Sequence, residues 1–205
     1  EKNIMVKIIF DFLLALFGII LFAPIFLVII FLIKLDSKGS VFFMQSRVGL
    51  NGKVFKIIKF RTMNVNQNSN STITLKDDPR ITRIGKYLRK SKIDEIPELF
   101  NILIGDMSFV GPRPDVSGYA DLLKGENRNI LKLRPGITSH ASLKYANEEV
   151  LLSKVVDPIS YNNNTIYPDK VRMNLNYYKN HNIWIDIRVI FATVYMLLQK
   201  VFKNK

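Results

Sequence analysis

Asp94 and Glu95 are neighbours in a stretch that is otherwise rich in cations. Lys or Arg occupies positions 83, 86, 89, 90 and 92 just before the pair, and the segment GDMSFVGPRP follows it at residues 105–114. In that segment Arg113 stands between two prolines, so its guanidinium lies on a stiff loop suited to holding a phosphate through two parallel hydrogen bonds. Two acids among these cations therefore indicate a site for a phosphorylated ligand.

A pair of helices must position these acids. Apolar residues recur at helical spacing through residues 80–104, which predicts two helices with a junction near residues 91–94. Proline is tolerated only in the first turn of a helix, so Pro97 predicts that the second helix begins close to Asp94. Free amides and the helix dipole favour negative charge there. An ordinary N-cap would have the same pattern, since Asp is a preferred cap and Glu is common in a first turn.

The N-terminal part of the chain differs from the rest in composition. Residues 12–33 carry no charge and contain Pro24. As one straight helix they would measure about 33 Å, enough for a hydrocarbon core of roughly 30 Å. Pro24 lacks an amide proton and predicts a bend or break near Phe22 to Ala23, which leaves two arms that each reach about halfway across a bilayer.

Flanking charge does not decide how this segment meets the membrane. Lys2 and Lys7 precede the run, and Lys34 and Lys38 follow it. Cytoplasmic flanks collect such cations, so a re-entrant hairpin that enters and leaves on one face is as consistent as a spanning helix with a proline kink.

Residues 1–33 have no net charge, because Lys2 and Lys7 balance Glu1 and Asp11. Residues 34–205 therefore carry all of the net charge of +13. We therefore divide the chain into an apolar membrane segment, residues 1–35, and a basic domain, residues 36–205; that the first is a re-entrant anchor and the second a catalytic domain is what the family resemblance described below implies. Excess cationic charge beside an apolar anchor indicates anionic lipid headgroups, phosphorylated substrates or nucleic acid as partners. The absence of cysteine excludes disulfides and thiolate metal sites.

The expected fold class is mixed α/β, helix-rich with a small β-hairpin. Asn51-Gly52 between β-rich runs at residues 41–45 and 53–61 predicts the hairpin. The polar segment at residues 64–74 reads as a surface loop. A stripe of apolar residues from Ile183 to Val201 predicts an amphipathic helix, for which the bilayer surface and the protein core are both consistent, with the interface slightly favoured.

Several ordered motifs together resemble one family. The segments DPRITRIGKYLRKSKIDEIPELFNILIGDMSFVGPRPD at residues 78–115, RPGIT at 134–138 and GSVFFMQSRVGLNGKVFKIIKFRTM at 39–63 are similar to those of the bacterial sugar transferases, the monotopic phosphoglycosyl transferases. The proline-broken segment resembles their re-entrant helix. The likeness extends from about Lys7 to Phe202.

The resemblance implies a reaction and its participants. The reaction is transfer of a sugar 1-phosphate from a UDP-sugar to polyprenyl (undecaprenyl) phosphate, with release of UMP, as the first membrane step of bacterial glycan assembly. It implies Mg²⁺ as cofactor, membrane lipids as partners, and a monotopic enzyme on the cytoplasmic face of the bacterial inner membrane. It implies no nucleic acid and leaves a homodimer open.

The resemblance also implies roles for individual residues. Asp94 would be the nucleophile that forms an aspartyl phospho-sugar, and Glu95 would help to hold Mg²⁺. The expected phosphate or substrate contacts are the basic residues Arg89, Arg113, Arg134, Lys59 and Arg61. For Lys59 and Arg61 a solvated strand face is an equally good interpretation. Pro24 would act through membrane geometry.

One stretch departs from the family pattern. After RPGIT many members continue with a Gly-Trp-Ala-Gln-like sequence, whereas this chain has SHASLK at residues 139–144. His140 lies there, and a structural histidine is its more common role. The alternative function is a membrane-anchored basic nucleic-acid- or lipid-binding protein without catalysis, although no nucleic-acid-binding motif is present.

Overall fold

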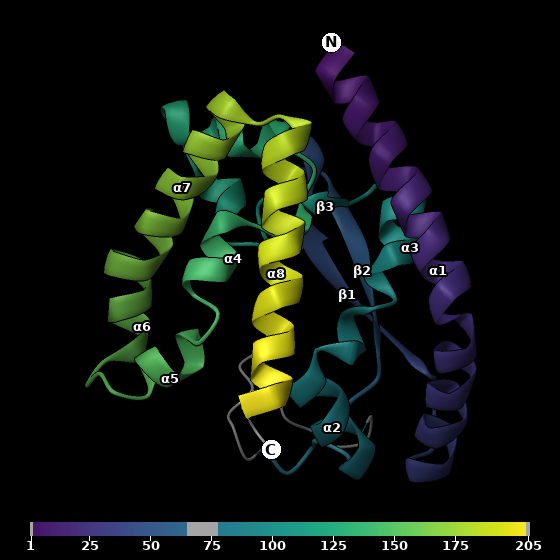
Figure 1. Cartoon of the computed structure of the whole chain (residues 1–205). Helices are drawn as coiled ribbons and strands as arrows, with labels where there is room; N and C mark the ends of the chain where they lie inside the picture. The colour runs from purple at the N-terminus through teal and green to yellow at the C-terminus, as the bar shows by residue number, and fades with distance from the viewer. Residues whose placement is uncertain (1, 65–77, 204–205) are drawn as a thin grey trace.

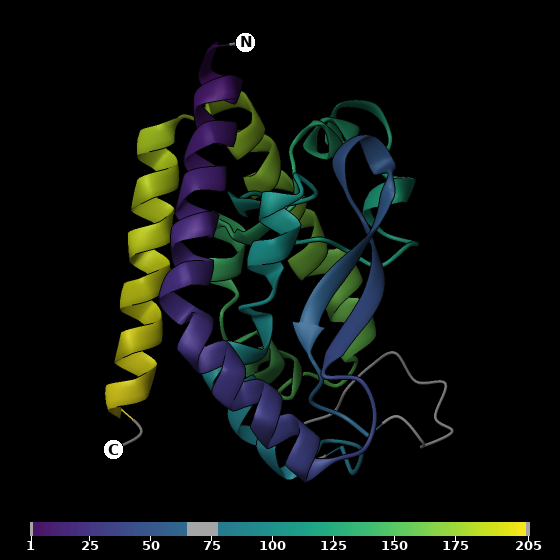
Figure 2. The same cartoon turned by 90° about the vertical axis from the view of Figure 1, so that its right-hand side faces the viewer.

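The long N-terminal helix runs along one side of the molecule. The computed structural model describes residues 2–64 and 78–203, so the loop predicted at residues 64–74 lies mostly outside the described residues. Helix α1, Lys2–Asp36, contains Pro24 and is continuous. It bends without breaking, and Figure 2 shows its second half leaning away from the first. The predicted bend is therefore confirmed as a bend within one helix. The expectation that residues 1–35 form a hairpin that turns back at Pro24 is wrong for this structure, because helical hydrogen bonding continues past the proline and α1 runs on to Asp36.

Both halves of α1 pack against the same domain. Ala15, in the first half, is buried with Ile57 and Leu99, and Phe26, in the second half, is buried against Phe60. The rings of Phe26 and Phe60 are 5.3 Å apart between centroids. The opposite side of α1 is exposed and apolar, and the segment Ile4–Asp36 is long and apolar enough to cross a membrane.

The predicted hairpin is confirmed. Strands β1, Phe42–Val48, and β2, Val54–Phe60, are antiparallel, with Val48 opposite Val54. The connecting turn places Asn51 at φ 56° and Gly52 at φ 78°, the left-handed conformation that Asn and Gly tolerate best. The first strand extends three residues beyond the predicted end at Gln45.

A single side chain closes the outer edge of β2. Asn101 is fully buried; its Oδ1 accepts a hydrogen bond of 2.9 Å from Ile58 N, and its Nδ2 donates one of 2.8 Å to Lys56 O. The amide thus pairs with a strand edge that would otherwise need another strand. This contact joins the hairpin to helix α3, Glu98–Leu103, which carries Asn101.

A second pair of strands is parallel and forms a separate small sheet. Strand β3, Ser108–Val110, pairs with β4, Gly136–Thr138, and sequence patterns had not indicated either. Gly111 and Gly136 make the pairing possible, because a Cβ on Gly136 would lie 2.1 Å from Gly111 N. The backbones approach so closely that no side chain fits.

Helices complete the rest of the molecule (Figure 1). Their bounds are α2 Arg83–Ser91, η2 Ile93–Glu95, η3 Ala120–Leu122, η4 Gly125–Lys132, α4 His140–Lys144, α5 Glu148–Leu152, α6 Pro158–Tyr161, the π-helical turn η5 Asn162–Ile166, α7 Tyr167–Asn180 and α8 Ile183–Lys203. The mixed, helix-rich fold class with a small hairpin is confirmed.

Helix α8 buries a charged residue and exposes large apolar ones. Asp186 is buried, whereas Trp184 and Phe191 are each 70% exposed. Asp186 accepts a hydrogen bond of 2.6 Å from Lys7 Nζ of α1 and another from the Tyr177 hydroxyl. Figure 2 shows α8 lying beside α1. Both helices carry exposed large apolar residues, as expected of surfaces that lie on lipid.

The Asn101 contact predicts a large loss of stability on an isosteric change. Asn101→Asp replaces the donor to Lys56 O with an oxygen and buries a charge, so we expect the free energy of unfolding to fall by about 2–4 kcal/mol. Thermal unfolding in detergent, followed by circular dichroism, measures the effect. Asn127→Asp makes the same change at an exposed position and should alter the melting temperature little. Equal melting temperatures for the two variants would contradict the role of Asn101.

Candidate active site

Asp94 lies in a short helical turn between α2 and α3. Lys92 adopts the left-handed conformation at φ 59° and ends α2, and η2 follows at once. The prediction that a second helix begins near Asp94 is confirmed in position, because helical backbone begins at Ile93, but it begins as a 3₁₀ turn and the α-helix α3 starts only at Glu98. The physical reason is Pro97, which has no N–H to donate to Ile93 O, so only tighter 3₁₀ turns form before it.

The Asp94 carboxylate is mostly buried. Its Oδ1 atom is buried and has no hydrogen-bond partner among the residues that the structure describes. Burial, together with the negative charge of Glu95, raises the pKa of Asp94 above its ordinary value. A carboxylate oxygen without a partner is costly in a folded protein and indicates a group reserved for a ligand or a reaction.

Glu95 has the opposite environment, although it is the next residue. Its Oε1 is 2.7 Å from Lys59 Nζ and 2.7 Å from an Arg113 guanidinium nitrogen. Burial alone would raise the pKa of Glu95, but Arg113 and Lys59 hold it well below its ordinary value. Glu95 is therefore a permanent carboxylate, and the predicted neighbours Lys59 and Arg113 do meet it.

A third carboxylate, missed in the sequence, shares Lys59 with Glu95. Glu98 is 2% exposed, and its Oε1 lies 3.2 Å from Lys59 Nζ without hydrogen-bond geometry. Burial raises the pKa of Glu98 to about 7, since one ammonium group only partly offsets the desolvation and the charge of Glu95 adds to it. A Glu in a first helical turn is usually a dipole partner, so the sequence carried no signal for this burial.

The hairpin fixes the loop that carries Arg113. Val48 N donates to Asp115 O at 2.9 Å, and an Arg47 guanidinium nitrogen donates to Pro114 O at 3.3 Å. Arg47 was not among the predicted residues. Burial lowers the pKa of its guanidinium, and the nearby positive charge of Arg113 lowers it further. The loop and hairpin together form the basic wall of the site.

The other predicted residues divide into two groups. Arg89, on α2, is half-buried and lies near enough to Asp94 to oppose the rise in its pKa that burial causes. Arg134 sits at the start of β4 with its guanidinium beside Gly105, where a Cβ would lie 3.7 Å away. Both are half-buried beside the segments that frame the site, and neither makes an ion pair among those found in the described residues.

Arg61 does not face this cluster. It is 4% exposed and donates to the carbonyl oxygens of Ser37 (2.7 Å) and Lys38 (2.8 Å). These bonds fasten the end of β2 to the segment after α1, so the expected substrate contact is replaced by a structural one. Pro24 is exposed on α1 and contributes no group to the cluster. His140 is exposed at the start of α4.

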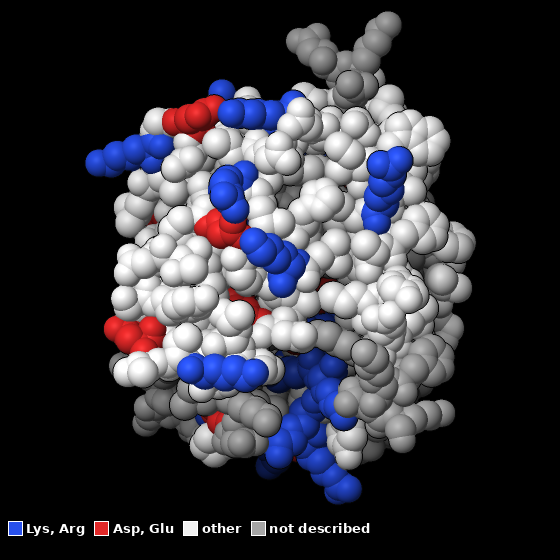
Figure 3. Space-filling view, turned by 60° about the vertical axis from the view of Figure 1, so that its left-hand side comes forward, with Lys and Arg blue, Asp and Glu red and all other residues white. Residues whose placement is uncertain are grey.

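The surface around this region is cationic. Figure 3 shows Lys and Arg side chains gathered in the lower part of one face, the end of the molecule where Figure 1 places α2. Helix α2 contributes exposed cations at Arg83, Lys86 and Lys90. A field of this sign attracts phosphorylated molecules toward the buried acids.

Comparison with known proteins identifies similar sequences. The model of a family described as bacterial sugar transferase matches residues 2–200. A UDP-glucose:undecaprenyl-phosphate glucose-1-phosphate transferase of Klebsiella pneumoniae is 37% identical over 99% of this chain and 41% of its own length. A UDP-N-acetylgalactosamine-undecaprenyl-phosphate N-acetylgalactosaminephosphotransferase of Aeromonas hydrophila is 37% identical over 92% of this chain and 42% of its own length.

Some relatives are closer to this chain in length. The exopolysaccharide production protein ExoY of Sinorhizobium fredii is 33% identical over 90% of this chain and 82% of its own length. The chain thus spans about two fifths of the first relatives and most of ExoY.

The environment of Glu98 predicts a pH-dependent stability. The folded protein holds the Glu98 proton up to about pH 7, whereas an unfolded chain releases it near pH 4.5. Unfolding therefore releases a proton between these values, and rising pH favours unfolding. Relative to Glu98→Gln, the wild type should lose roughly 1–3 kcal/mol of stability from pH 4.5 to 7. Melting temperatures of both proteins in EDTA across this range measure it, and parallel curves would contradict the assignment.

Proposed function

Because the chain belongs to the bacterial sugar transferase family, we propose that it moves a sugar 1-phosphate from a UDP-sugar to a polyprenyl phosphate and releases UMP. One observation carries the proposal: a buried Asp94 oxygen, which has no hydrogen-bond partner within the described part of the chain, lies next to a glutamate that two cations hold ionised. The relatives from Klebsiella pneumoniae and Aeromonas hydrophila are named for UDP-sugars and undecaprenyl phosphate, which supports the same substrate classes here.

The first step is attack by the Asp94 carboxylate on the β-phosphorus of the UDP-sugar. A bond forms between an Asp94 oxygen and phosphorus, the bond from phosphorus to the bridging oxygen breaks, and UMP leaves with that electron pair. The product is an acyl phosphate that carries the sugar, an aspartyl phospho-sugar. Burial favours this attack, because a desolvated carboxylate is not shielded by water.

The second step repeats the displacement with the lipid. A phosphate oxygen of the polyprenyl phosphate attacks the same phosphorus, the bond to Asp94 breaks, and the free carboxylate returns. The product is a polyprenyl diphosphate sugar. Neither step needs a net proton transfer, so the site needs cations more than it needs a general base. Arg113 and Lys59 supply them at the wall, with Arg89 on the approach from α2.

The donor atoms fit a hard divalent ion such as Mg²⁺. No group of three His, Cys, Asp or Glu side chains gathers within residues 2–64 and 78–203, so the protein alone does not complete a metal site there. Mg²⁺ is commonly held by one or two carboxylates together with substrate phosphates. Suitable ligand atoms for this ion are Asp94 Oδ1, which has no hydrogen-bond partner among the described residues, and the carboxylate of Glu95. Lys59 and Arg113 both contact Oε1 of Glu95. When bound, the ion would neutralise diphosphate charge that repels an incoming carboxylate.

The way in which α1 is fastened to the domain bears on the membrane placement that we propose. Lys7, near its beginning, pairs with Asp186, and Asp36, at its end, accepts a hydrogen bond of 2.9 Å from Ile84 N. Both ends of α1 are therefore tied to one domain, which supports a monotopic arrangement with the site on the cytoplasmic face. Asp94 would then meet both a water-soluble donor and a membrane-embedded phosphate.

Asp94→Asn should abolish turnover. The amide is a poor nucleophile, so we expect UMP release from a panel of UDP-sugars, with Mg²⁺ and undecaprenyl phosphate present, to fall by at least about 10³-fold. Wild type treated with EDTA should lose activity as well.

The matched control for this experiment is Asp157→Asn. Asp157 caps α6, and Asn caps a helix equally well, so activity should persist. Mass spectrometry of wild type given donor without acceptor should show the sugar-phosphate on Asp94. Full activity of Asp94→Asn would refute the nucleophile.

Single cysteines can test the side of the membrane. The chain has no cysteine, so Ile4→Cys and Lys38→Cys each introduce one label site at opposite ends of α1. With a membrane-impermeant maleimide we expect neither to react in intact spheroplasts and both to react after lysis. Reaction of Ile4→Cys alone in intact spheroplasts would show that α1 spans the membrane.

A further inference from the structure

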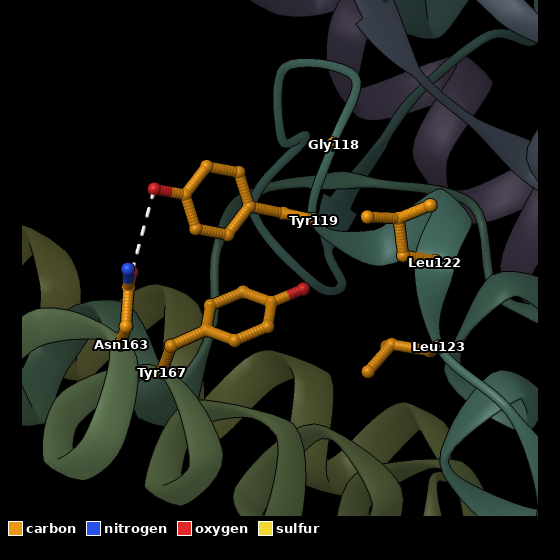
Figure 4. Close-up of a pocket in the computed structure, with 6 residues that line it drawn as sticks. All are labelled: Gly118, Tyr119, Leu122, Leu123, Asn163 and Tyr167. Carbon is orange, nitrogen blue, oxygen red and sulfur yellow. Dashed lines mark hydrogen bonds between the residues drawn. The ribbon is translucent and has the colours of Figure 1, made fainter.

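An open cavity of about 440 Å³ lies beside the proposed site and takes no part in the chemistry described above. It is lined by Gly118, Tyr119, Leu122, Leu123, Asn163 and Tyr167 (Figure 4). Its volume falls within the roughly 300–1,000 Å³ of typical ligand clefts. The lining combines two aromatic rings and two leucines with few polar groups.

One loop connects this cavity to the acids. The Tyr167 hydroxyl donates to Asp115 Oδ2 at 3.1 Å, and Asp115 is two residues after Arg113, which contacts Glu95. Two residues span at most about 7 Å of chain. Asp115 also lies close enough to Arg47 and Arg113 for their charges to act on it. The cavity is therefore adjacent to the cations that would hold a diphosphate.

The shape of the lining favours a flat ring. The rings of Tyr119 and Tyr167 meet edge to face, 5.1 Å apart between centroids, and Figure 4 shows the leucines across from them. A planar heterocycle gains stacking energy on such rings. A hexose would instead bring several hydroxyl groups, each needing a polar partner, and this lining supplies few.

The rim offers an amide with both a donor and an acceptor. Asn163 is exposed, and the Tyr119 hydroxyl reaches its Oδ1 only at a loose 3.5 Å. A side-chain amide complements the adjacent N–H and carbonyl of a uracil edge. Asn163 lies in η5, a single π-helical turn, and such turns occur frequently at functional sites.

We propose that this cavity binds the uracil ring of the nucleotide, with the ring against Tyr119 and Tyr167 and its edge toward the Asn163 amide. In a UDP-sugar the base is separated from the β-phosphate by a ribose and the α-phosphate, so its cavity must lie beside the phosphate site and not on it. The identity of the nucleotide rests on the proposed function. The assignment makes Tyr119 and Asn163 determinants of donor binding that do not touch the reacting atoms.

Titration calorimetry with UMP tests the assignment without turnover. The purified full chain in detergent with Mg²⁺ is titrated as wild type, Tyr119→Leu and Asn163→Leu. Loss of base stacking should weaken UMP binding by Tyr119→Leu by about 10- to 100-fold. Loss of one edge contact should weaken binding by Asn163→Leu by roughly two- to tenfold. Tyr119→Phe keeps the ring and should weaken binding less than Tyr119→Leu.

The control is Tyr195→Leu, the same substitution at an exposed position on α8. It should bind UMP like wild type, and the melting temperature of each variant reports its folding. UMP affinity unchanged in a folded Tyr119→Leu would overturn the assignment. So would a rise in the KM for the UDP-sugar without a change in UMP affinity, because the cavity would then hold the sugar.

Failure of this assignment is separable from failure of the proposed function. If Asp94→Asn abolishes UMP release while Tyr119→Leu binds UMP normally, the transferase stands and the uracil cavity does not. If wild type binds UMP through Tyr119 but releases none from any donor, the cavity stands and the transferase does not.

Discussion

Lys59 is the charge on which the arrangement of the site depends. Its ammonium lies between the carboxylates of Glu95 and Glu98, both removed from water. Without it, two buried acids three residues apart would repel each other, and the desolvation of Glu98 would have no ion pair to offset it among the described residues. Arg113 reinforces one of the two pairs from the opposite loop. A strand, a helical turn and a proline-stiffened loop are thereby held around one cation, and Asp94 lies beside this cluster without entering it.

This arrangement gives neighbouring acids different properties. Asp94 receives burial without an ion pair, and Glu95 receives burial with two. Their pKa values shift in opposite directions for that reason. Both residues lie in the same 3₁₀ turn, so the difference comes from the direction in which each side chain points. Two acids adjacent in the chain can in this way acquire the different environments that the proposed nucleophile and a permanent anion require.

The sequence predicted the parts of the site that depend on local chemistry. Asp94, Glu95 and Arg113 are recognisable because adjacent acids and a guanidinium between prolines have meaning without a fold. Lys59 and Arg61 looked equivalent, as residues two apart on a strand share a face. They differ because β2 ends at Phe60, and Arg61 turns to the carbonyls that follow α1. The sequence of β2 does not show where α1 ends, so it cannot reveal that Arg61 meets the carbonyls beyond that helix.

The same limit applies to Asn101 and Glu98. Each sits on the short helix α3 at a position where an exposed polar residue would be ordinary. Their burial arises from contacts more than thirty residues away in sequence, to β2. The hairpin, the bend at Pro24 and the amphipathic C-terminal helix were predictable because turn chemistry, proline geometry and periodicity act within a few residues. The parallel pair of β3 and β4 joins segments of three residues each, too short to leave a pattern.

The ion pair between Lys7 and Asp186 has a consequence for how this protein is related to its membrane. Near the start of α1, Lys7 neutralises the buried carboxylate of Asp186 on α8, and the second half of α1 fills the core against Phe60. The apolar helix is thus a structural component of the domain as well as its candidate membrane anchor. A boundary drawn after residue 35 separates two regions of composition, but it cuts through one hydrophobic core. Removing α1 to obtain a soluble fragment would expose that core and leave Asp186 without Lys7. The apolar helix therefore cannot be removed without destabilising the rest of the domain.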